Sequence, residues 1–99
     1  MRTNMAHNNQ LDVPDAALRD SKSLEILRIW IAEGRQHVSL RIGVWDDPAA
    51  WGLMLADLMR HIVNTYKPGT ASDRERILER IRLGLAAELE SPTDEPTEQ

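Results

Sequence analysis

Residues 24–42, LEILRIWIAEGRQHVSLRI, decide the fold of this chain. The run 24–32 is dense in β-branched and aromatic residues, which favour strands. The run 36–42 alternates apolar and polar residues, which is the two-residue period of a strand with one buried face. Between the runs lies Glu33-Gly34, and a glycine there supplies the positive φ of a tight turn. The stretch therefore predicts a β-hairpin with a two-residue loop.

The two-residue loop fixes which residues lie opposite one another, and it pairs Ile29 with Val38 and Trp30 with His37. Cross-strand partners share one face of a hairpin, and a slip of one residue would mix the two faces. The apolar face is expected to carry Leu27, Ile29, Ile31, Val38, Leu40 and Ile42. The polar face is expected to carry Ile26, Arg28, Trp30, His37, Ser39 and Arg41.

Two amphipathic helices are predicted after the hairpin. Asp47 can cap the first helix, Pro48 suits its first turn, and Lys67-Pro68-Gly69 ends it. Its apolar residues recur at helical spacing: Trp51, Leu55, Leu58, Ile62 and Tyr66.

The second helix is expected to begin with a capping box from Ser72 to Glu75 and to end at Ser91-Pro92. Its apolar stripe comprises Ile77, Leu78, Ile81, Leu85 and Leu89. Gly84 weakens this helix by about 1 kcal/mol relative to alanine, unless a neighbouring element packs closely there.

The expected fold class is α+β, a β-hairpin packed against two amphipathic helices in the order ββαα. Residues 1–23 are predicted to be mostly disordered, although Pro14 can begin one short helical turn. Residues 24–90 form the single ββαα domain, and residues 91–99 form an acidic disordered tail.

Composition excludes several function classes. Cysteine is absent, which removes disulfides, thiolate nucleophiles and cysteine-bound metal clusters. The net charge is −4, of which −3 lies in residues 91–99, so the remainder is near neutral and nucleic-acid binding is not expected. No apolar run approaches the roughly 20 residues of a membrane span, and the first ten residues lack the apolar core of a secretion signal. We expect a cytoplasmic protein without membrane contact.

The polar hairpin face is the candidate ligand-binding site, formed by Arg28, Trp30, His37, Ser39 and Arg41. Two guanidinium groups, an indole and an imidazole can bind an anion or a nucleotide by pairing and stacking. The simpler interpretation is an amphipathic strand face on which arginine stems cover Trp30, or a dimer interface, and we favour it.

No catalytic or metal-binding pattern is found. The histidines His7, His37 and His61 fall on different segments and lack the spacing that puts two imidazoles on one helix face. Asp46 and Asp47 are explained by helix capping, and Asp57 with His61 is explained as a surface pair at i and i+4. We therefore expect no cofactor, no metal ion and no enzymatic activity.

The chain resembles a family of short uncharacterised bacterial proteins known only as a domain of unknown function. The likeness is carried by residues 36–41 (QHVSLR), 45–52 (WDDPAAWG), 55–57 (LAD) and 60–62 (RHI), and it extends over residues 24–66. The resemblance implies a bacterial origin and no assigned activity or cofactor. Five residues within these segments are the first to mutate: His37, Arg41, Trp51, Asp57 and His61.

Self-association is the functional expectation that follows from the architecture. A two-stranded hairpin is marginal by itself, and its open edges invite another chain. We expect a small non-enzymatic interaction domain that forms a homodimer, edge to edge or through helix faces, and binds an unidentified protein partner. Two alternatives are a monomer whose N-terminal segment or tail covers the sheet, and a small anion- or nucleotide-binding domain that uses the polar hairpin face.

Overall fold

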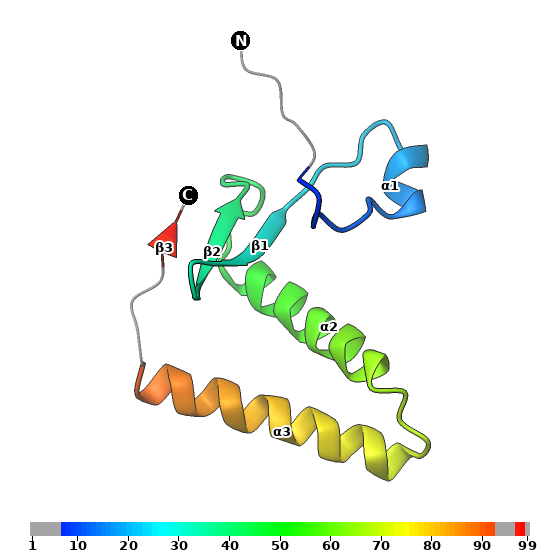
Figure 1. Cartoon of the computed structure of the whole chain (residues 1–99), viewed down its shortest axis with the longest axis vertical. Coiled ribbons are helices and arrows are strands. Elements are labelled where there is room, and N and C mark those ends of the chain that lie inside the picture. The colour runs from blue at the N-terminus through cyan, green and yellow to red at the C-terminus, as the bar shows by residue number, and fades with distance from the viewer. Residues whose placement is uncertain (1–6, 93–96, 99) are drawn as a thin grey trace.

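A computed structural model describes residues 7–92 and 97–98 of the chain. In chain order the described elements are α1 (Asp15–Arg19), β1 (Leu27–Ala32), β2 (Arg35–Leu40), α2 (Ala49–Thr65), α3 (Ala71–Glu90) and β3 (Thr97–Glu98). The hairpin is followed by two long helices (Figure 1), so the α+β class and the ββαα order are confirmed.

The hairpin has the predicted register. β1 and β2 are antiparallel, with Ile29 opposite Val38 and Trp30 opposite His37. Glu33 and Gly34 form the loop with φ values of 55° and 72°, which is the left-handed conformation that a two-residue turn of this kind requires at both positions. The loop therefore fixes the two faces, as the sequence predicts.

A short third strand extends the sheet beside β2. β3 runs parallel to β2, with Thr97 opposite His37 and Glu98 opposite Val38, so the strand order is β1-β2-β3. The predicted disordered tail, 91–99, falls partly outside the described residues, and β3 was not predicted from the sequence. Two residues carry too little periodicity to mark a strand, because this pairing depends on a distant edge and not on local pattern.

The segment before the hairpin contains the short helical turn that Pro14 indicated. Pro14 precedes α1, and its carbonyl accepts hydrogen bonds from the backbone N–H groups of Ala17 and Leu18. The hydroxyl of Ser23 donates to the Ala17 carbonyl at 2.7 Å, which ties the end of this segment to α1. Residues 1–6 of the predicted disordered segment lie outside the described residues.

The start of α2 is fixed by an aspartate and two indoles. Pro48 is the N-cap residue of α2, and the carboxylate of Asp47 before it accepts a hydrogen bond from the backbone N–H of Ala49 at 2.9 Å, so it satisfies one of the first N–H groups of the helix. Trp45, in the preceding loop, meets Trp51 edge to face with ring centroids 5.0 Å apart. These contacts set the direction in which the chain leaves the sheet.

The predicted cap of α3 is wrong by two residues. Thr70, and not Ser72, is the N-cap, and its hydroxyl accepts a hydrogen bond from the backbone N–H of Asp73 at 3.0 Å. Both Thr70 and Ser72 have an acidic residue three positions later, so the sequence pattern fits either; the chain becomes helical directly after Gly69-Thr70. A hydrogen bond from the Arg76 guanidinium, helped by the Thr70 hydroxyl, lowers the pKa of the Asp73 carboxyl below its ordinary value of 3.8.

Close backbone contacts join the two long helices to one another, but they do not join either helix to the sheet. Between elements of the described residues, Cα atoms come within 8 Å only from β1 to β2, from β2 to β3 and from α2 to α3. Figure 1 shows α2 and α3 as a V that is closed at the loop joining them and opens toward the C-terminal end of α3. Within the described residues, Val63 near the closed end of the V is the one hydrophobic residue that is buried.

Candidate functional site

The five predicted site residues lie on the hairpin, and the register places four of them as facing pairs. Arg28 lies opposite Ser39, and Trp30 lies opposite His37. Arg41 follows β2, where its backbone N–H donates to the Ile26 carbonyl at 2.9 Å and extends the ladder. The polar face is thus formed as predicted, but its side chains divide into two groups.

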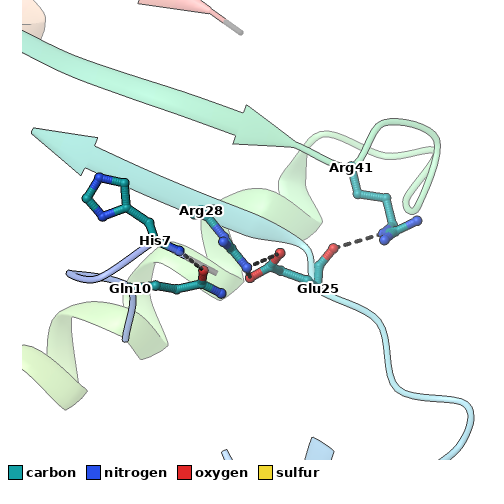
Figure 2. Close-up of polar contacts among 5 residues, drawn as sticks. All are labelled: His7, Gln10, Glu25, Arg28 and Arg41. Carbon is teal, nitrogen blue, oxygen red and sulfur yellow. Dashed lines mark hydrogen bonds and ion pairs between the residues drawn. The ribbon is translucent and has the colours of Figure 1, made fainter. Parts of the chain in front are cut away.

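Glu25, which was not predicted from the sequence, organises the first group. The Arg28 guanidinium forms an ion pair with the Glu25 carboxylate, with the closest contact at 2.9 Å. The Nε of Arg41 donates to the backbone carbonyl of Glu25 at 2.8 Å. Figure 2 shows the two arginines reaching Glu25 from opposite sides. Glu25 precedes β1, so the two-residue alternation of a strand could not reveal that it joins this face.

The first group borders an open hollow of about 280 Å³ at the end of the hairpin away from its turn. Its lining residues are Glu25, Ile26, Leu27, Arg28, Ser39, Leu40 and Arg41. Because Glu25 neutralises Arg28, the Arg41 guanidinium supplies the net positive charge of the hollow. The arrangement can attract a small anion, but with one charge and not the two that the sequence suggested.

The second group lies nearer the turn and includes a histidine from outside the hairpin. The ring of His7 meets Trp30 edge to face with centroids 4.8 Å apart. His37 Nε2 lies 3.1 Å from the carbonyl oxygen of Ala32. The segment that carries His7 thus packs against the half-buried indole of Trp30, and no sequence signal links two residues so far apart in the chain.

The remaining titratable candidates are dispersed. His61 Nε2 lies 3.2 Å from Asp57 Oδ2 on the exposed side of α2, which confirms a surface pair. In the described part of the chain, histidine and acidic side chains do not gather in groups of three that could hold a metal ion. None of the helices described combines the length and the apolar content that crossing a membrane requires.

Exposed apolar side chains are the most extensive surface feature. They occur on both strands of the hairpin, on α2 and along the C-terminal half of α3. Those on these elements and just after β2 are Ile29, Ile31, Leu40, Ile42, Leu53, Leu55, Ile62, Leu83, Leu85 and Leu89. Single exposed leucines are ordinary, whereas large contiguous apolar patches are typical of interaction sites in general.

Comparison with known proteins gives a structural relative and a family. A solved chain described as "Structure of a putative pyruvate dehydrogenase from the photosynthetic bacterium Rhodopseudomonas palustrus CGA009" is similar to this one, with 29% sequence identity and a TM-score of 0.72. The match covers 96% of this chain and 97% of that one, so the two share the whole fold. No curated protein is similar enough to count as a relative. A family model matches residues 10–93, and the chain therefore belongs to the family described as a domain of unknown function, DUF5076.

Proposed function

We propose that this protein is a non-enzymatic interaction domain that works as a homodimer. One observation carries the proposal: within the described residues, large hydrophobic side chains are exposed on the hairpin, on α2 and on the C-terminal half of α3.

Contact between these apolar side chains and water is unfavourable. An interface of standard size buries roughly 800 Å² on each partner, and association with a second copy of the chain is the most economical way to cover such a surface.

The dimer is expected to act in the cytoplasm of a bacterium. A cysteine-free sequence suits the reducing cytoplasm, and the structural relative comes from a bacterium. We infer a bacterial cytoplasmic protein whose dimer binds a further, unidentified protein. The non-enzymatic role is inferred from a sequence in which no nucleophile, base or metal-ligand spacing is found.

Sedimentation equilibrium over a micromolar concentration series tests the homodimer. The expected mass is twice the 11.3 kDa of the chain. A mass of one chain at every concentration would contradict the proposal, because the exposed apolar surface would then be stable in water.

Anion binding at the polar hairpin face is a second candidate, supported by the hollow that Arg28, Ser39 and Arg41 border beside Glu25. Titration calorimetry with inorganic phosphate and with a nucleoside triphosphate tests it. Arg41→Ala is expected to abolish the heat of binding, whereas Arg60→Ala, an exposed arginine on α2, leaves it unchanged. Absence of heat with either ligand would eliminate this candidate.

A further inference from the structure

The apolar stripe of α3 is covered along only half of its length. It runs through Ile77, Ile81, Leu85 and Leu89, four residues apart, so all four lie along one ridge of the helix. Ile77 and Ile81 are half-buried beside α2. Leu85 and Leu89 continue the same ridge but are 49% and 74% exposed, because α2 and α3 diverge (Figure 1).

The covered half of the stripe borders a hollow. This hollow has a volume of about 350 Å³ and is lined by Tyr66, Ile77, Arg80 and Ile81, at the closed end of the V. One half of α3 thus presents two exposed leucines, and the other half borders a recess that two isoleucines, Tyr66 and Arg80 line. A two-fold axis places each half of α3 against the opposite half of the partner's α3. A helix with these two surfaces is therefore complementary to a second copy of itself.

Charge along α3 favours the antiparallel arrangement that such an axis gives. Residues 71–82 contain four arginines and three acidic residues, whereas residues 83–90 contain Glu88 and Glu90 and no base. Antiparallel pairing sets the acidic end of each helix beside the arginine-rich half of the other, and it also opposes the two helix dipoles. Parallel pairing would set like charge beside like charge.

We propose that a second copy of this chain docks antiparallel along α3, with Leu85 and Leu89 of each protomer seated in the hollow between Tyr66, Ile77 and Ile81 of the other. This inference rests on the proposed homodimer and names its interface. Two helices that stay in contact over several turns cross at a shallow angle of about 20°. The occupant is a second copy because the acidic end of α3 complements the opposite, arginine-containing half of the same helix, and because the exposed leucines and the hollow lie on the same chain.

Leu83 and Leu85 provide a matched pair of variants. They are 51% and 49% exposed, two residues apart, and they lie on opposite faces of α3. Leu85→Glu is expected to raise the dimer dissociation constant by about a hundredfold or more, since the two-fold axis introduces the change twice. Leu83→Glu is expected to leave the constant within about threefold of the parent value. Sedimentation equilibrium measures both, and circular dichroism verifies that both variants keep their helices.

Cross-linking tests the direction of the helices in a chain that has no cysteine of its own. In the antiparallel dimer the two copies of position 77 lie about 18 Å apart, as do the two copies of position 89, which is too far for a disulfide. In the antiparallel dimer, a mixture of Ile77→Cys and Leu89→Cys chains forms a disulfide-linked dimer under mild oxidation, and neither variant alone does. Dimers from either variant alone would indicate parallel pairing and would overturn the inference.

The outcomes separate this inference from the proposed function. A monomeric parent protein contradicts both. A dimeric parent with equal effects of Leu83→Glu and Leu85→Glu leaves the homodimer standing and rejects α3 as its interface. Dissociation by Leu85→Glu alone, together with cross-linking only in the mixture, supports the interface.

Discussion

Arg41 and Glu25 are joined by a hydrogen bond from the arginine Nε to the backbone carbonyl oxygen, 2.8 Å long, which connects the end of β2 to the chain that enters β1. Beside it, the Arg41 backbone N–H donates to the Ile26 carbonyl at 2.9 Å. The two bonds close the end of the hairpin away from its turn. Arg41 therefore has a structural role, whether or not it binds an anion.

Arg41→Ala is expected to lower the free energy of unfolding by about 1 kcal/mol, the net contribution of one such hydrogen bond. Amide hydrogen exchange should accelerate first near that end of the hairpin, at Arg28 and Ser39, and urea unfolding at a fixed protein concentration measures the total effect. Arg60→Ala is the control. Equal exchange rates in the two variants would show that the side-chain bond does not hold the strands.

Substitution of glycine by alanine is expected to have opposite effects in the hairpin turn and in α2. Gly34→Ala is expected to destabilise the protein by about 1–2 kcal/mol, because a φ of 72° is left-handed and strained for alanine. Gly52→Ala is expected to stabilise α2 by up to about 1 kcal/mol, since no heavy atom lies within 4 Å of the added Cβ. Urea midpoints at equal protein concentration compare them. A stabilising Gly34→Ala would be incompatible with this turn.

The cap of α3 predicts that two neighbouring hydroxyl residues differ. Thr70→Ala is expected to destabilise the protein by about 1 kcal/mol, because it leaves the Asp73 backbone N–H without its acceptor. Ser72→Ala lies inside the helix and is expected to be neutral or slightly stabilising. Thermal unfolding of both variants checks this, and a larger loss for Ser72→Ala would restore the capping box that the sequence suggested.

The Asp73 carboxylate predicts a dependence of stability on pH. Its pKa is lowered from 3.8 by the Arg76 hydrogen bond, with help from the Thr70 hydroxyl. A carboxyl whose folded pKa lies below its unfolded value stabilises the protein above the unfolded value and loses that contribution as the pH falls through the folded value. Asp73→Asn should therefore lower the melting temperature at pH 7, and the difference from the parent should shrink by pH 3. A difference that stays constant between these pH values would contradict this role.

Local pattern was sufficient for the hairpin. A two-residue loop with glycine in its second position allows one register, and strand alternation then assigns Val38 to one face and His37 to the other. The α3 cap was misplaced because Thr70 and Ser72 satisfy the same pattern. Glu25 and His7 were missed because they reach the polar face from irregular segments, where no period constrains a side chain.

The sequence by itself determined the element order, the hairpin register and the apolar stripe of α3, because each depends on neighbours within a few residues. Tertiary structure alone decided that Glu25 neutralises Arg28, that β3 joins β2, and that α2 diverges from α3 and leaves Leu85 and Leu89 exposed. An apolar stripe indicates that one face of a helix is buried, but it does not identify the element that buries it. That choice depends on the angle at which the loop at Lys67-Pro68-Gly69 sets the two helices, and on the surface that remains for a second chain.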